Sequence, residues 1–120
     1  MTILVVEDEE LINKMLQMAL RPIGLEVVFA HNVPEAFNIL EQALPDVIVM
    51  DIHLPGSKGW ELLDALRDDP ATQDIPVIVL TAHVDLDNQQ TAMLKGVSEF
   101  LSKPVLPDVL REAVLKVLNH

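Results

Sequence analysis

The chain has 120 residues, half of them hydrophobic, which is enough to bury the core of one domain and too hydrophobic for a disordered chain. Nineteen acidic residues against eight basic ones give a net charge of −11. That balance argues against direct binding to nucleic acid, whose affinity comes largely from cationic contacts to phosphate. The absence of cysteine excludes disulfides, thiolate zinc sites and cysteine nucleophiles.

No apolar run approaches the ~20 residues that a membrane-spanning helix needs, so we expect no membrane insertion. The N-terminus starts directly with a strand-like run and has neither a basic segment nor a small-residue cleavage signal. We therefore expect a cytoplasmic protein. Most of the acidic residues are interpreted as a solvated surface. The remainder are available for one cation-binding site and for complementarity to a basic partner.

Strand-like and helix-like segments alternate along the chain. The first strand is predicted over residues 3–6, a short β-branched run of the kind that is buried on both faces of a parallel sheet. A helix over 10–20 follows, with apolar residues at 3.6-residue spacing, and Pro22 and Gly24 end it. The second strand is predicted over 25–30. The next helix begins near Pro34, a favoured first helical residue, and reaches residue 43.

The third strand, residues 47–50, ends at Asp51, and residues 54–59 are predicted to form a loop because of their proline and glycine content. A helix over 60–67 and a turn-rich segment precede the fourth strand, 77–80. The helix over 86–95 is the most polar, so we expect it to be solvated and mobile. Gly96 caps this helix. A fifth strand over 97–101 and a helix over 107–118 complete the pattern.

Five strand–helix units of this length predict an α/β fold, in which a doubly wound five-stranded parallel sheet carries helices on both faces. We expect the flavodoxin-like strand order 2-1-3-4-5. No repeat, low-complexity tract or linker interrupts the sequence, so residues 1–120 are predicted to form a single domain. Whether this domain is a whole protein or a part of a longer one is left open.

Polar residues follow the apolar runs at the sheet edge where open α/β folds bind their ligands, the carboxyl ends of the strands. Glu7 and Asp8 follow the first strand, Asp51 the third, Thr81 the fourth and Lys103 the fifth. Three carboxylates in a low-dielectric cleft repel one another, and a hard divalent cation relieves that repulsion. The sequence therefore predicts a site for Mg²⁺ or Mn²⁺ at this edge.

We expect Asp8 and Asp51 to be direct ligands of the cation, Glu7 to act through water, and His53 to offer its backbone carbonyl. A carboxylate can also attack phosphorus and form an aspartyl-phosphate, and Asp51 has the surroundings for that role.

The transition state of such a transfer spreads charge over three oxygens. We expect the cation to serve one oxygen and the Lys103 ammonium another. The Thr81 hydroxyl and the backbone N–H groups of Ile52 and Ala82 complete the predicted phosphate site.

Four segments together resemble a known family: VVEDE at 5–9, VMDIHLPG at 49–56, VLTA at 79–82 and FLSKP at 100–104. Each is a weak signal alone, but all four stand in order at predicted strand ends. On these residues the chain resembles a response-regulator receiver domain of two-component signalling, and the resemblance covers essentially all 120 residues.

The resemblance implies a role for each residue of the predicted site. Asp51 would be the phosphoacceptor, and Lys103 would bind the phosphate and precede a cis bond to Pro104. Thr81 would be a switch hydroxyl and Phe100 an aromatic that rotates inward on phosphorylation. The acidic pair Glu7 and Asp8 with the carbonyl of His53 would hold the metal, while the side chains of His53 and His83 would flank the phosphoryl group.

The resemblance also implies the partners. A histidine kinase or a phosphotransfer protein would supply the phosphoryl group, and a downstream protein would recognise the changed surface of the fourth helix, fifth strand and last helix. The chain would then be a signalling switch, not an enzyme, since its only chemistry would be self-catalysed transfer to Asp51 and autodephosphorylation. The apolar strip of the last helix is interpreted as core first, and as a candidate surface for a homodimer or a target second.

Simpler interpretations remain beside these. Asp51 and Thr81 can be caps of turns or helices, Glu7–Asp8 can be an acidic helix start, and Phe100 can be an ordinary buried aromatic. Among whole functions, a haloacid-dehalogenase-type phosphatase would need an acid at position 53, where histidine stands. A flavodoxin-like cofactor binder would need a phosphate loop after the first strand, where acids stand. A receiver that acts as a constitutive adaptor is the remaining alternative.

Overall fold

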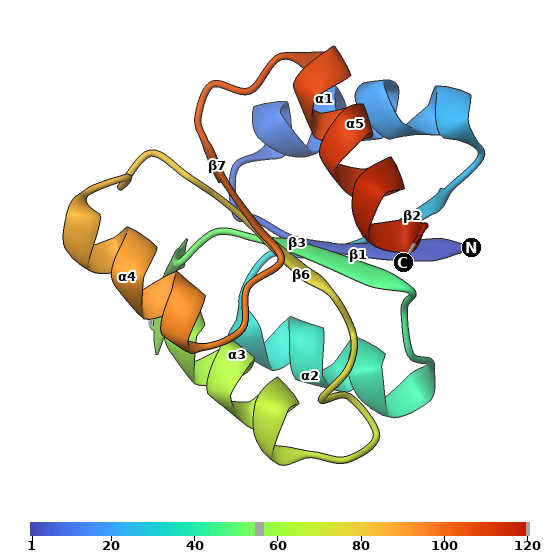
Figure 1. Cartoon of the computed structure of the whole chain (residues 1–120). Helices are drawn as coiled ribbons and strands as arrows, with labels where there is room; N and C mark the ends of the chain where they lie inside the picture. Colours follow the sequence, from blue (N-terminus) through green and yellow to red (C-terminus); the bar gives the residue numbers. More distant parts are fainter. Residues whose placement is uncertain (55–56, 120) are drawn as a thin grey trace.

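The computed structural model describes residues 1–54 and 57–119. A parallel sheet with the order β2-β1-β3-β6-β7 runs through the molecule, with helices on both faces (Figure 1). Its strands are β1 (Thr2–Val6), β2 (Glu26–Ala30), β3 (Val47–Met50), β6 (Val77–Thr81) and β7 (Glu99–Ser102). This order confirms the predicted doubly wound α/β fold, because β6 and β7 are its fourth and fifth strands.

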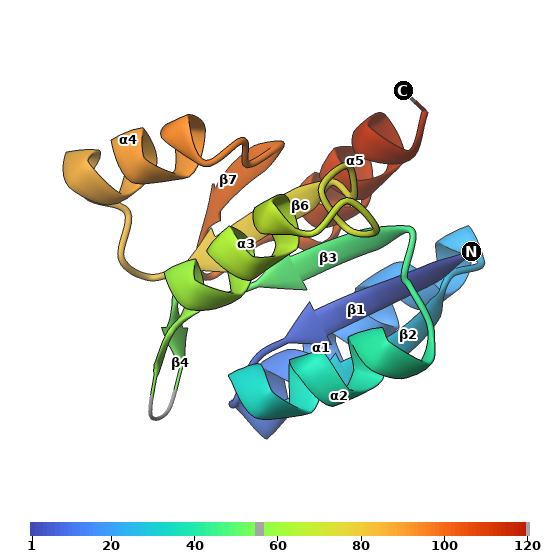
Figure 2. The ribbon, with the colours of Figure 1, turned by 90° about the horizontal axis from the view of Figure 1, so that it is seen from below.

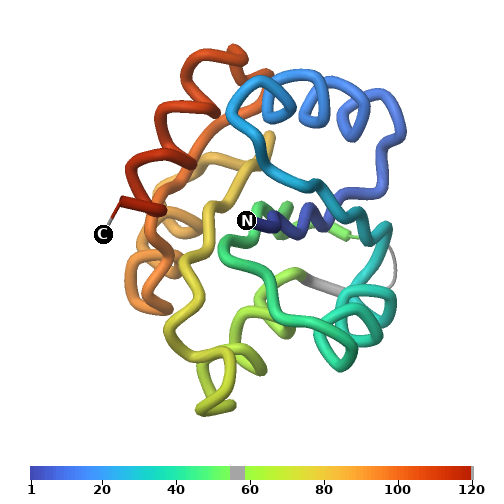
Figure 3. The backbone as a smooth tube through the Cα atoms, turned by 90° about the vertical axis from the view of Figure 1, so that its right-hand side faces the viewer, coloured from blue at the N-terminus to red at the C-terminus, as the bar shows by residue number. Residues whose placement is uncertain are grey.

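The α-helices are α1 (Glu10–Leu20), α2 (Val33–Gln42), α3 (Gly59–Asp68), α4 (Leu86–Leu94) and α5 (Pro107–Leu118), with a short 3₁₀ helix, η1 (Arg21–Ile23), after α1. Helices α1 and α5 lie on one side of the sheet, and α2 and α3 on the other (Figure 3). Within the described ranges, no helix is long and apolar enough to cross a bilayer.

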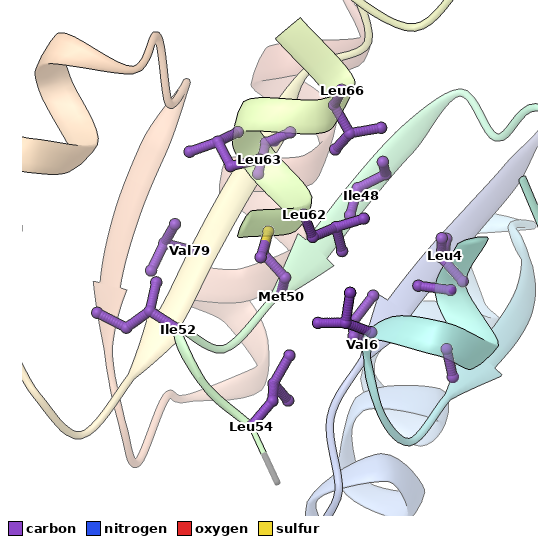
Figure 4. Close-up of a cluster of buried hydrophobic side chains, with 14 residues drawn as sticks. Leu4, Val6, Ile48, Met50, Ile52, Leu54, Leu62, Leu63, Leu66 and Val79 are labelled. Atoms are coloured by element: carbon purple, nitrogen blue, oxygen red, sulfur yellow. The ribbon is translucent and has the colours of Figure 1, made fainter. Parts of the chain in front are cut away.

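The central strands are apolar throughout because both of their faces are buried. Leu4 and Val6 of β1 point to the α2–α3 side, whereas Ile3 and Val5 point to the α1–α5 side. Since successive residues of a strand face opposite ways, an unbroken run of Ile, Leu and Val supplies both layers. Figure 4 shows the α2–α3 layer, where Met50 lies beside Leu62 and Leu63 of α3.

The loop prediction over 54–59 was wrong in part. His53–Leu54 (β4) and Ser57–Lys58 (β5) form a two-stranded antiparallel pair, which projects beyond the end of β3 (Figure 2). Helix α3 then begins at Gly59. Pro55 and Gly56, which also belong to the segment that resembles the family, lie outside the described residues.

Helix α1 has a narrower buried face than its sequence suggests. The side chains of Leu16, Ala19 and Leu20 are buried, but Leu11 and Met15 are exposed. Asn13 is buried instead, at 4% exposure. A polar residue therefore faces inward on this helix, while three large apolar residues, Leu11, Met15 and Met18, face the solvent.

Helix α4 is joined to the rest of the fold at its two ends. Of its side chains only Ala92 is buried, whereas Met93 and Leu94 are largely exposed. After its last turn, Gly96 adopts a positive φ of 75°, a conformation that favours glycine. The guanidinium of Arg67 on α3 donates to the carbonyls of Lys95 and Gly96 there, and to those of Gln73 and Ile75 before β6.

Candidate functional site

The predicted polar residues converge at the carboxyl ends of the central strands. Glu7 follows β1, Asp51 follows β3, Thr81 is the last residue of β6, and Lys103 follows β7. Glu7, Asp51 and Thr81 are buried, with exposures of 2%, 6% and 0%. The strands position these groups because their registers are fixed by ladder bonds, which include the bond from the Asp51 N–H to the Val6 carbonyl at 3.2 Å.

Lys103 joins the two buried carboxylates. Its Nζ lies 2.7 Å from Asp51 Oδ2 and 2.8 Å from Glu7 Oε2, and it donates a hydrogen bond to each. The backbone N–H of Lys103 also donates to the Thr81 carbonyl at 2.9 Å. The peptide bond that follows, Lys103–Pro104, is cis.

The charges of this cluster do not balance. Burial raises the pKa of Glu7, and its ion pair with Lys103 only partly offsets that increase. Burial also lowers the pKa of Lys103, but hydrogen bonds to Asp51 and Glu7 outweigh it, so that pKa is raised. One ammonium thus faces two carboxylates with little access to solvent. The excess negative charge and the oxygen donors fit a hard divalent cation.

Asp51 and Thr81 are held in matching ways. The backbone N–H of His53 donates to Asp51 Oδ1 at 3.0 Å, and that of His83 donates to Thr81 Oγ1 at 3.1 Å. Each side chain therefore accepts from the backbone two residues further on, as in Asx and ST turns. The rings of His53 and His83 contact each other, with centroids 3.6 Å apart.

Gly59 brings the start of α3 against the phosphoacceptor candidate. A Cβ at this position would lie 2.5 Å from the Asp51 carbonyl oxygen and 2.8 Å from Ile52 Cα. The Gly59 N–H donates to the Ile52 carbonyl at 2.9 Å. Only a residue without a side chain allows the backbone to approach so closely.

Not every predicted residue joins the cluster. Asp8 and Ala82 are exposed at the same edge of the sheet. Phe100 is half-buried on β7 and packs against the α2–α3 core layer. In the part of the chain that the structure describes, no three acidic or histidine side chains are arranged ready to hold a metal ion. Glu7 and Asp51 instead both form ion pairs with Lys103.

One residue of this region was not predicted. Asn13 of α1 donates from Nδ2 to the backbone carbonyl of Glu7 at 2.9 Å. The sequence signal that could have found it is a polar residue within the apolar periodicity of the helix, between Ile12 and Leu16.

The structure is a doubly wound α/β fold with an aspartate and a lysine at the carboxyl ends of its strands. The family model described as the response regulator receiver domain matches residues 3–115. The chain therefore belongs to the receiver-domain family of two-component response regulators.

Two curated relatives illustrate the similarity. The phosphate regulon transcriptional regulatory protein PhoB of Pseudomonas aeruginosa is 38% identical over 119 residues, which cover 99% of this chain and 52% of PhoB. The response regulator PleD of Caulobacter vibrioides is 36% identical over 98% of this chain and 26% of PleD. The chain thus spans about half the length of PhoB and about a quarter of the length of PleD.

Solved structures agree with this fold. A response regulator from Chloroflexus aurantiacus superposes with a TM-score of 0.93 at 33% identity and covers 99% of this chain and 98% of its own. The chemotaxis response regulator CheY4 of Vibrio cholerae gives 0.89 at 28% identity, with 97% of each chain covered. The receiver domain of the sensor kinase PA1611 from Pseudomonas aeruginosa shares the fold at 0.89 and 24% identity, covers 99% of this chain and 98% of its own, and has magnesium in its active-site cleft.

Proposed function

We propose that this chain is a phosphorylatable receiver whose phosphoacceptor is Asp51. The observation that carries the proposal is the hydrogen bond that Lys103 Nζ donates to Asp51 Oδ2 at 2.7 Å. It lies at the carboxyl ends of the strands. An ammonium in this position neutralises charge as it develops on a transferring phosphoryl group. The other carboxylate oxygen, Oδ1, is held by the His53 N–H.

The phosphoryl group would come from a phosphohistidine of a histidine kinase or a phosphotransfer protein. An oxygen of Asp51 attacks phosphorus, the bond between phosphorus and the donor's imidazole nitrogen breaks, and the electron pair of that bond stays with the imidazole. Lys103 then neutralises one phosphoryl oxygen. The Thr81 hydroxyl and the N–H groups of Ile52 and Ala82 are the remaining donors that we assign to the phosphate.

Magnesium, or manganese, is the cofactor that the donor set fits. Asp51 and Asp8 would hold the ion directly, Glu7 through water, and His53 by its backbone carbonyl. When bound, the ion supplies charge neutralisation for the phosphoryl oxygens. The magnesium in the related PA1611 receiver domain supports this assignment.

The signal would leave by protein contact in the cytoplasm. Thr81 would move toward the phosphate, and Phe100, already half-buried on β7, would rotate inward. The surface of α4, β7 and α5 would change, and a downstream protein would recognise it. The exposed apolar side chains of α4, Met93 and Leu94, support α4 as part of that surface.

Intact mass after incubation with acetyl phosphate tests the proposal, with and without Mg²⁺, on the wild type and Asp51→Asn. We expect one phosphoryl adduct that requires both the metal ion and Asp51. A folded wild type that gains no adduct with Mg²⁺ present would overturn the proposal and favour the adaptor alternative.

A further inference from the structure

We propose that Asn13 is a positioning residue of the cation site, which holds the β1–α1 connection so that its two acids face the ion. The inference rests on the proposed function, because it assigns a role toward the cation assumed there. Asn13 lies on α1, six residues after Glu7. Packing of the helix does not require a buried amide at this position, and the predicted phosphate chemistry does not use one.

The first step of the argument is the contact itself. Asn13 Nδ2 donates to the backbone carbonyl of Glu7 at 2.9 Å, in a buried environment. That carbonyl belongs to the peptide group that links Glu7 to Asp8. Because a peptide group is planar, a bond to its oxygen fixes the orientation of the plane, and with it the direction in which the chain enters Asp8.

The second step concerns the other side of Glu7. Its N–H donates to the Ala30 carbonyl at 2.9 Å, which fixes the preceding peptide plane. With both planes held, Glu7 has little backbone freedom. Its carboxylate is then held as well, by Lys103 at Oε2 and by the Glu9 N–H at Oε1. Among the described residues, Asn13 is the one side chain that donates a hydrogen bond to the peptide group linking the two acids.

The third step is the cost of keeping Asn13. Its Oδ1 is buried and has no hydrogen-bond partner among the described residues. The amide cannot be turned over to relieve this, because Oδ1 would then face the Glu7 carbonyl oxygen. An unpaired buried acceptor destabilises the fold. A leucine would fill an apolar helix face without that penalty, so the donor to Glu7 is the property that distinguishes asparagine here.

The test is the affinity for Mg²⁺, measured by calorimetry on the wild type, Asn13→Leu and Asn13→Asp. Leucine and aspartate both remove the N–H₂ donor, and aspartate keeps the shape of the side chain. We expect each to weaken Mg²⁺ binding by about tenfold or more, as the loss of a group that orients a metal ligand commonly does. Asn32→Ala is the matched control, because Asn32 caps α2 by accepting from the Glu35 N–H at 2.9 Å and its side chain makes no hydrogen bond to Glu7 or Asp8 among the described residues.

A second readout needs no metal ion. In the metal-free protein, hydrogen exchange at the amides of Asp8 and Glu9 should be faster in the two Asn13 variants than in the wild type and in Asn32→Ala. If the wild type binds no Mg²⁺, the proposed function fails, while the exchange rates still decide whether Asn13 holds the connection. Mg²⁺ affinity and exchange rates equal to those of the wild type, in either folded Asn13 variant, would overturn the inference.

Discussion

The imidazole ring of His53 packs against that of His83, with centroids 3.6 Å apart and planes inclined by 37°. The two residues follow different strands, so this contact joins the connection after Asp51 to the connection after Thr81. Both backbones already bind the functional side chains, through the His53 and His83 N–H groups. We therefore expect the ring contact to couple the phosphoacceptor candidate to the switch candidate.

A double-mutant cycle should detect this coupling. We expect the effects of His53→Ala and His83→Ala on the free energy of unfolding to be non-additive by about 0.5 kcal/mol, the lower end for aromatic pairs, because both residues are exposed. Urea denaturation of the single and double variants measures it. His53→Ala combined with His31→Ala is the control and should be additive. Additivity in the His53–His83 cycle would show that the ring contact does not couple the two connections.

Lys103→Met should destabilise the protein at neutral pH, because it leaves Glu7 and Asp51 buried without their cation. We expect the free energy of unfolding to fall by about 3–5 kcal/mol, as it does when other buried ion pairs are broken. Lys116→Met, which breaks an exposed pair with Glu99, should cost less than about 1 kcal/mol. Urea denaturation of both variants gives the comparison, and equal losses would contradict the prediction.

The loss in Lys103→Met should also shrink as the pH falls. Burial already raises the pKa of Glu7 in the folded protein, and removal of the ammonium raises it further. A carboxyl whose pKa is raised by folding favours the folded state below its unfolded pKa, and this contribution is lost as the pH rises through the folded pKa. Unfolding at pH 5 and at pH 7.5 tests this, and a constant difference from the wild type would contradict it.

Gly59→Ala should impair phosphorylation as well as stability. The added Cβ meets backbone atoms of Asp51 and Ile52 at less than 3.0 Å, so the chain that carries the phosphoacceptor must shift. We expect a loss of about 1–3 kcal/mol in stability and slower adduct formation with acetyl phosphate. Gly24→Ala is the control: its positive φ of 77° makes alanine unfavourable by about 1 kcal/mol, but it meets no atom within 4 Å. Gly24→Ala should therefore form the adduct at the wild-type rate. If Gly59→Ala formed the adduct as fast as Gly24→Ala, the prediction would be contradicted.

His31 should titrate at a higher pH than an ordinary histidine. Its Nε2 lies 2.9 Å from Glu10 Oε1 and its Nδ1 lies 3.1 Å from Glu35 Oε2, and hydrogen bonds with these carboxylates, Glu10 first, raise its pKa. The resulting stabilisation is complete below the unfolded pKa and disappears as the pH rises through the folded one. Since the cluster is exposed, we expect its contribution to the free energy of unfolding to be small.

An NMR titration of the histidine ring protons measures this pKa. Glu10→Gln should lower the pKa of His31 toward its ordinary value, whereas Glu112→Gln on α5 should leave it in place. An unchanged His31 pKa in Glu10→Gln would show that the pair does not form in solution.

Sequence reasoning was most successful where one physical cause dominates. The apolar runs before Asp51 and Thr81 predicted buried strands, and the strand order placed Asp51 and Glu7 at one edge. It was less successful where the composition of a segment hides a local strand pairing. The β4–β5 pair forms in a segment whose proline and glycine indicate only a loop.

Two details of the site depend on contacts that form only in the folded chain. Lys103 forms an ion pair with Glu7 as well as with Asp51. The pair with Glu7 depends on how far the side chains reach across the sheet edge, which no residue pattern encodes. The burial of Asn13 was not predicted, because a single polar residue within an amphipathic helix usually faces the solvent. Leu11 and Met15, exposed on the same helix, show the converse.

Helix α4 is anchored at both of its ends and is little buried between them. Near its first turn, Asn88 donates to the His83 carbonyl at 3.0 Å, so the helix start is fastened to the connection that follows Thr81. At its far end Arg67 fastens the turn of Lys95 and Gly96 to α3. With so little of its length buried, a small shift at Thr81 would displace the start of α4 most, and the helix would turn about the end that Arg67 anchors.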